Sequence, residues 1–182
     1  MGGWDLPKDA EINGTTYQIR SDYRAVLDVL TISADPELTD DERGALALEV
    51  FYPDFGAMPP SDYGDAVKFL RWFVGGGDIH ARPPRRKLAD WQQDFPLIVS
   101  PVNRVLGYEV RDVEYLHWWT FLGAYMDVGD CLFAQVVSIR KKRSMGKRLD
   151  KHEREFYREN RDLVDFRVQE TDAEKEILDE WM

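Results

Sequence analysis

The segment LHWWTFLGAYM, residues 116–126, constrains the fold more strongly than any other part of the chain. The twelve positions between Glu114 and Asp127 carry no charge, whereas a membrane span needs about 20 mostly apolar residues. The large side chains cover nearly the whole circumference of a helix, which is typical of the central helix of a bundle. We therefore predict a buried helix over about residues 112–126. Its core side chains are Trp118, Trp119, Phe121, Leu122 and Tyr125.

Aromatic N–H and O–H groups need hydrogen-bond partners when they are buried. Within this segment His117 and Glu114 are the polar side chains that could accept those bonds. We expect both to have a packing role of this kind.

Local signals in the first third of the chain predict a short hairpin followed by a helix. Asn13-Gly14 stands between alternating apolar and β-branched residues, and this dipeptide is a strong signal for a two-residue hairpin turn. An apolar-periodic run over about residues 22–33 follows, and Ser21 or Asp22 can cap it.

Two more helices are expected before residue 78. Thr39 and Glu42 have the spacing of a capping box, and Pro53 ends the helix that this box begins. The next helix starts at a cap provided by Ser61 or Asp62 and ends at the triple glycine, residues 75–77.

The second half of the chain is predicted to be helical throughout. Residues 87–107 indicate two helical pieces separated at Phe95-Pro96. Asp130 can cap a helix over residues 131–143, and residues 150–166 form a last, strongly charged helix. The expected fold class is mainly α, a compact helical domain of about six to seven helices with a small N-terminal β-hairpin.

The expected organisation is one domain with an interruption and a tail. Residues 1–74 hold the hairpin and the first helices, and residues 75–87 form a linker rich in Gly, Pro and Arg. Residues 88–167 form a helical core, and residues 168–182 an acidic C-terminal tail.

Charge argues against non-specific binding to nucleic acid or anionic lipid, because the net charge is −10. Residues 140–161 are the exception, with ten basic and four acidic residues. Such a block favours a surface that faces a protein partner. The predicted partner-binding residues are Arg85, Arg86, Lys87, Arg140, Lys141, Lys142 and Arg143. An alternative use of the same residues is duplex binding by a nucleic-acid-binding regulator.

No residue pattern indicates a metal site or a cofactor. The three histidines lack the spacing of zinc ligands, and no Lys-Ser or Lys-Thr follows the triple glycine as a phosphate-binding loop requires. Cys131 is the only cysteine, so no disulfide can form within the chain, and a reducing cytoplasm is expected. Cys131 could be a nucleophile with His117 as its base, but at the start of an apolar run it is predicted to be a core residue.

Three stretches resemble a known family of bacteriophage proteins, the gene-product-fifteen family. They are GYEVRD, LHWWTFLGAYM and RLDKHEREFYREN, and the similarity extends over roughly residues 10–165. The resemblance implies a small non-enzymatic protein of long-tailed phages and prophages, encoded among the tail genes close to the tape-measure gene. It implies no catalytic or ligand-binding residues.

The position of the family among tail genes implies a role in tail morphogenesis in the cytoplasm of the bacterial host. The expected role is that of a tail assembly chaperone which binds the tape-measure or tail-tube proteins. The alternatives are a structural virion component of the tail or neck, a nucleic-acid-binding regulator, and an enzyme that uses Cys131 and His117.

Overall fold

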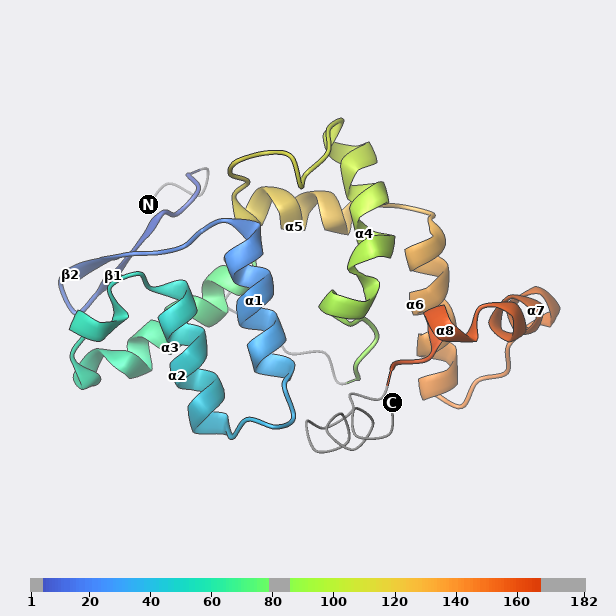
Figure 1. Ribbon diagram of the computed structural model, residues 1–182, viewed down its shortest axis with the longest axis horizontal. Helices are drawn as coiled ribbons and strands as arrows, with labels where there is room; N and C mark the ends of the chain where they lie inside the picture. The colour runs from blue at the N-terminus through green and yellow to red at the C-terminus, as the bar shows by residue number, and fades with distance from the viewer. Residues whose placement is uncertain (1–4, 79–85, 168–182) are drawn as a thin grey trace, which may run out of the picture. The chain divides into compact units, whose positions relative to one another are not determined.

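The computed structural model describes residues 5–78 and 86–167, and it is mainly helical with one hairpin (Figure 1). This confirms the predicted fold class. The hairpin and the helices before residue 78 are β1 (Asp9–Ile12), β2 (Thr15–Gln18), α1 (Tyr23–Ala34), α2 (Asp40–Phe51), two 3₁₀ turns (Phe55–Ala57 and Pro60–Asp62) and α3 (Tyr63–Val74). The helices after residue 86 are α4 (Trp91–Leu106), α5 (Trp118–Met126), α6 (Leu132–Ser144), α7 (Lys151–Glu159) and α8 (Arg161–Val164).

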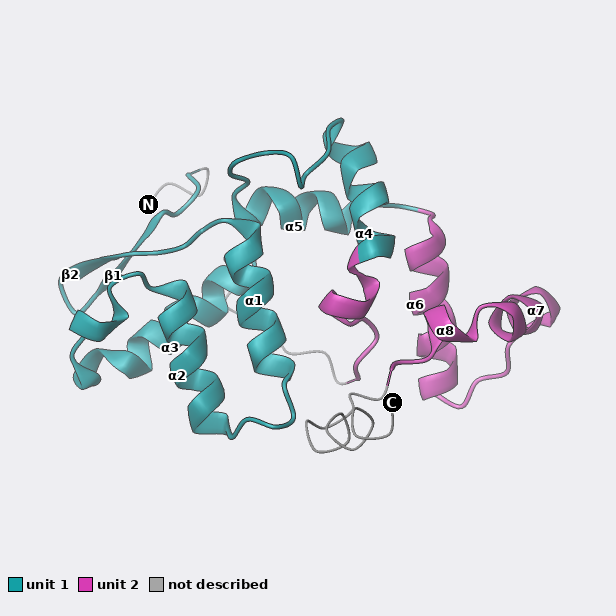
Figure 2. Ribbon diagram, viewed as in Figure 1, with its two compact units in different colours: residues 1–85, 96–129 teal, residues 86–95, 130–182 magenta. Residues whose placement is uncertain are grey.

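The chain divides into two compact units (Figure 2). Unit 1 comprises Met1–Arg85 and Pro96–Gly129, and unit 2 comprises Arg86–Phe95 and Asp130–Met182. The boundary passes through α4, so each unit is built from two separate stretches of sequence. Among the described residues, no helix is both long enough and apolar enough to span a bilayer.

The hairpin forms where the Asn-Gly signal predicts it. Asn13 and Gly14 have φ of 50° and 80°, the left-handed conformation that a two-residue turn between twisted strands requires. β1 and β2 pair antiparallel, and Ala10 and Ile12 point into the core of unit 1. Asn13 also donates to Asp62 at 3.0 Å. The hairpin is thereby attached to the start of α3.

The first two predicted helix caps are confirmed. Asp22 accepts from the backbone N–H of Arg24 at the start of α1, and Thr39 and Glu42 form the capping box of α2. The third is wrong. Asp62 precedes α3 but makes no capping hydrogen bond, because its carboxylate accepts from the side chains of Asn13 and Tyr17 in the hairpin.

Unit 1 has an aromatic core centred on α5. Trp118 and Phe121 are buried, and the Phe121 ring stacks on the Tyr23 ring of α1 with centroids 4.7 Å apart. Trp119, Leu122 and Tyr125 are half-buried, so the prediction that α5 is buried all round is too strong. Offset aromatic pairs add to the free energy gained by burying their area.

The start of α5 differs from the prediction, since the helix begins at Trp118 and not near residue 112. Residues 112–114 form a turn and a bend, and His117 forms an isolated antiparallel bridge with Asp22. Leu116 accepts from Tyr23 N–H at 2.9 Å, and Trp118 N–H donates to Ser21 at 2.8 Å. The Leu116 carbonyl is therefore bonded to a distant segment, and α5 begins only at Trp118.

The partners of the two indoles also differ from the prediction. Trp118 Nε1 donates to the carbonyl of Val74, and Trp119 Nε1 donates to that of Phe73. Glu114 is exposed. The glycines that end α3 lie against α5, since a Cβ on Gly77 would be 3.0 Å from the Trp119 ring. The triple glycine thus allows the end of α3 to approach α5 closely.

Helix α4 is continuous, which corrects the predicted separation at Phe95-Pro96. Pro96 removes one backbone hydrogen bond from a helix interior. The helix persists because Ile98, Val99 and Val102 lie buried along one face beyond the proline. Asp90 also caps the start of α4, because its carboxylate accepts hydrogen bonds from the backbone N–H groups of Gln92 and Gln93.

The helices of unit 2 differ from the prediction at two points. Cys131, and not Asp130, is the cap of α6, and its Sγ accepts from Ala134 N–H at 3.4 Å. Cys131 is half-buried, so it is not the core residue that was predicted. The last charged helix is interrupted at Asn160, whose φ and ψ of −131° and 43° separate α7 from α8.

Candidate functional site: the cationic surface of unit 2

The predicted partner-binding residues are divided between the interior and the surface of unit 2. Arg140 is buried, with 5% of its surface exposed, which corrects its assignment to a partner-facing surface. Lys141 and Arg143 are exposed at the end of α6, while the half-buried Lys142 pairs with Glu153 at 2.5 Å. The remaining three are Arg86 and Lys87, which are exposed before α4, and Arg85, which lies outside the described residues.

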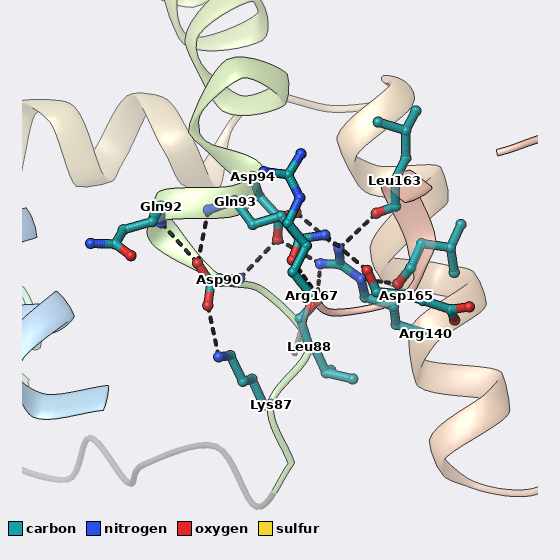
Figure 3. Close-up of polar contacts among 11 residues, drawn as sticks. Lys87, Leu88, Asp90, Gln92, Gln93, Asp94, Arg140, Leu163, Asp165 and Arg167 are labelled. Carbon is teal, nitrogen blue, oxygen red and sulfur yellow. Dashed lines mark hydrogen bonds and ion pairs between the residues drawn. The ribbon is translucent and has the colours of Figure 1, made fainter. Parts of the chain in front are cut away.

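Arg140 forms a buried, two-pronged ion pair with Asp94 of α4 (Figure 3). Nη1 lies 2.5 Å from one carboxylate oxygen and Nη2 lies 2.9 Å from the other. The side chains are 4% and 0% exposed. Parallel hydrogen bonds of this kind fix the orientation of both groups and strengthen the attraction between the charges.

The other N–H groups of Arg140 bind backbone carbonyls. Nε donates to Val164 at 2.7 Å, Nη2 to Leu163 at 2.8 Å and Nη1 to Leu88 at 3.2 Å. A guanidinium has five N–H donors, so these bonds and the ion pair use all of them. Arg140 therefore connects α6 with α8 and with the start of α4, and its charge is not available to a partner.

Residues 163–167 are held to the rest of unit 2 by polar contacts on both sides, and Figure 3 shows those with Gln93 and Arg140. Gln93 of α4 donates to the carbonyl of Asp165 and accepts from Arg167 N–H, both at 2.9 Å. Tyr157 of α7 donates to the Asp165 carboxylate at 2.9 Å, and Arg143 forms an ion pair with it. These contacts fix residues 163–167 within unit 2.

The charge on Asp165 is stabilised by these neighbours. Burial would raise the pKa of its carboxyl group, but the hydrogen bonds from Arg143 and Tyr157 outweigh it and hold the pKa below its ordinary value. Arg143 is thus engaged within unit 2, although its side chain is partly exposed.

Helix α7 carries exposed cations and also contacts the rest of unit 2. Lys151, Arg154 and Arg158 are exposed and follow the i, i+3, i+7 spacing of a single helix face. At neighbouring positions of the helix, Glu153 binds Lys142 and Tyr157 binds Asp165. The spacing of Lys151, Arg154 and Arg158 in the sequence indicates these exposed cations. Our prediction named only residues 140–143 in this part of the chain and missed them.

The exposed cations of α6, of the following loop and of α7 form what we call the cationic surface. It consists of Lys141, Lys147, Arg148, Lys151, Arg154 and Arg158. Within residues 5–78 and 86–167, no carboxylate lies within ion-pair distance of the first four. Arg154 donates to the carbonyl of Leu149, and Arg158 lies 3.7 Å from Glu159. The first four of the six cations thus make no ion pair with a described residue.

The residues considered for catalysis make hydrogen bonds within the fold. His117 is buried, and its Nδ1 accepts from Trp119 N–H at 3.0 Å. Its Nε2 lies 2.9 Å from the carbonyl of Pro7, so Nε2 must carry the proton. Burial lowers the pKa of His117. Both of its nitrogens are thus occupied, as is Cys131 Sγ. In the part of the chain that the structure describes, no group of three or more potential ligands could hold a metal ion.

The fold is mainly helical, and unit 2 carries a set of exposed cations between residues 141 and 158. Residues 4–166 match the family model described as bacteriophage Gp15 protein. Because the match covers most of the chain, the protein belongs to this bacteriophage family. No curated protein and no solved structure gives a significant match to the chain.

Proposed function

We propose that this protein acts in phage tail morphogenesis as an assembly chaperone that binds the tape-measure protein or the tail-tube protein. It acts by binding and not by catalysis, in the cytoplasm of the bacterial host. The observation that carries the proposal is the cationic surface, a set of exposed positive charges in a chain with a net charge of −10. Membership of a bacteriophage family provides the biological setting.

The cationic surface suits a protein partner better than a nucleic acid. Met145 follows α6 and is 48% exposed between Lys141 and Lys147. A flexible methionine beside charged groups can adapt to the side chains of a helical client. The strongly acidic remainder of the chain would repel a nucleic acid at longer range.

The experiment that tests the proposal is co-expression with the tape-measure protein of the same phage, followed by affinity capture. We expect the tape-measure protein to become soluble and to co-purify. The double variant Lys147→Glu/Arg148→Glu should lower capture about tenfold, because each exposed ion pair contributes on the order of 1 kcal/mol or less. The control is Lys68→Glu/Arg71→Glu on α3 of unit 1. It changes the net charge by the same amount and should not lower capture of the tape-measure protein.

Two outcomes would contradict the proposal. If neither the tape-measure protein nor the tail-tube protein is captured while neck proteins are, a structural component of the virion is the better description. If both double variants weaken capture equally, the interaction depends on net charge and not on the cationic surface.

A further inference from the structure

We infer that the acidic C-terminal segment, residues 168–182, binds the cationic surface of unit 2 within the same chain. The inference concerns the free protein and does not depend on a role in tail assembly. It rests on the uncompensated charges of the surface, on the composition of the segment and on the place from which the segment starts.

The two charge patterns are complementary. The segment VQETDAEKEILDEWM has six acidic residues and one basic residue, Lys175. The cationic surface has six basic side chains, four of which have no carboxylate within ion-pair distance among the described residues. Opposite charges attract weakly at an exposed surface, and several such pairs acting together can hold a short segment in place.

The segment starts beside the surface that it is inferred to bind. Asp165 is hydrogen-bonded to Tyr157, which belongs to α7. Arg167 N–H is bonded to Gln93. Fifteen residues can extend up to about 50 Å, whereas the nine residues of α7 rise only about 14 Å along its axis. The segment is therefore long enough to reach the cations of α7.

Attachment to the same chain makes weak contacts effective. A short tether keeps the segment at a local concentration in the millimolar range, so a contact too weak to form between separate molecules is still populated. The apolar side chains of Ile177, Leu178 and Trp181 can add to this contact, with Met145 exposed beside Lys141 and Lys147. A client that binds the same surface would have to displace the segment.

The test is paramagnetic relaxation enhancement in the full chain. Cys131→Ser preserves the cap of α6 and removes the only native thiol, and Ala173→Cys then carries a nitroxide label. We expect the label to reduce the amide signals of α7 at about 0.1 M salt. The signals should recover at about 1 M salt, where the screening length is about 3 Å.

A charge-swap series makes the test specific. Lys151→Glu/Arg154→Glu/Arg158→Glu should abolish the signal loss, and adding Glu170→Lys/Glu174→Lys/Glu176→Lys to these changes should restore it. Lys68→Glu/Arg71→Glu is the control and should leave it unchanged. No signal loss in α7, a loss that persists at high salt, or a failure of the charge swap would overturn the inference.

The same label distinguishes binding within one chain from binding between copies. An isotope-labelled chain without nitroxide is mixed with a nitroxide-labelled chain without isotopes. Binding within one chain predicts no loss of α7 signals in this mixture. If the mixture loses as much α7 signal as the chain that carries both isotopes and nitroxide, the segment binds the cationic surface of a second copy. That result would overturn the inference.

Discussion

Unit 1 and unit 2 are stabilised around opposite kinds of centre. In unit 1, Phe121 and Trp118 of α5 are buried among aromatic rings, with Phe121 stacked on Tyr23. In unit 2, the buried centre is the ion pair between Arg140 and Asp94. An aromatic core stabilises the fold because apolar area is removed from water, and it tolerates small changes in the packing of its side chains. A buried ion pair tolerates little, because each charge depends on the other.

The largest expected effect is the loss of an aromatic ring from unit 1. Phe121→Ala should lower the free energy of unfolding by about 3–5 kcal/mol, because a cavity replaces a fully buried ring. Met126→Ala, at the exposed end of the same helix, should change it by about 0.5 kcal/mol or less. Urea unfolding measures both values. Equal effects from the two variants would show that α5 is not the centre of unit 1.

A slightly smaller effect is expected when the ion pair of unit 2 is broken. Arg140→Met should cost about 3 kcal/mol, because it leaves the Asp94 carboxylate buried without a counter-charge. Its matched control is Lys141→Met, the adjacent exposed position, with an expected change of about 0.5 kcal/mol or less. Hydrogen exchange should locate the loss of protection in α6 and α8.

The double variant Arg140→Met/Asp94→Leu sharpens the comparison further. It removes both charges and should be less destabilising than Arg140→Met alone. Recovery should be incomplete, because the carbonyls of Leu88, Leu163 and Val164 lose their donors. A double variant less stable than Arg140→Met would contradict a role of Arg140 as the counter-charge of Asp94.

An intermediate effect is expected at the contact between the end of α3 and α5. Gly77→Ala should cost about 2 kcal/mol, since it combines a left-handed φ with a Cβ that meets the Trp119 ring. Gly107→Ala has a similar φ of +80° but open space around the added Cβ, so it should cost only about 1 kcal/mol. Thermal unfolding compares the two. Equal losses would mean that the approach to Trp119 has no energetic consequence.

The smallest expected effect is a pH dependence confined to unit 1. Burial holds the pKa of His117 below its ordinary value of 6.5. The unfolded chain therefore takes up a proton at a pH where the folded chain does not. Stability should be full above about pH 6.5 and fall as the pH decreases toward the folded pKa. His117→Asn should reduce this dependence, and the exposed control His152→Asn should not.

The sequence predicted the elements whose signals are local. The turn at Asn13-Gly14 and the capping box of Thr39 and Glu42 depend on residues within a few positions, and both are present. The start of α5 could not be found in this way, because it is determined by backbone bonds from Ser21 and Tyr23. Such pairings are invisible to local patterns.

The candidate site was predicted only in part. The excess of basic residues in residues 140–161 correctly indicated where the exposed cations lie. Composition could not separate Arg140 from Lys141, although one is buried and the other exposed. Helix periodicity could have done so, because Arg140 lies seven positions after Phe133 and four after Val136, on the face that α6 buries.

The most direct test of the proposed function is lysine reactivity in the complex with the tape-measure protein. Amine-reactive labelling followed by mass spectrometry compares Lys141, Lys147 and Lys151 with Lys68 of α3. We expect the three lysines of the cationic surface to lose reactivity in the complex, while Lys68 keeps it. A stable complex in which the three lysines react as fast as in the free protein would contradict the account.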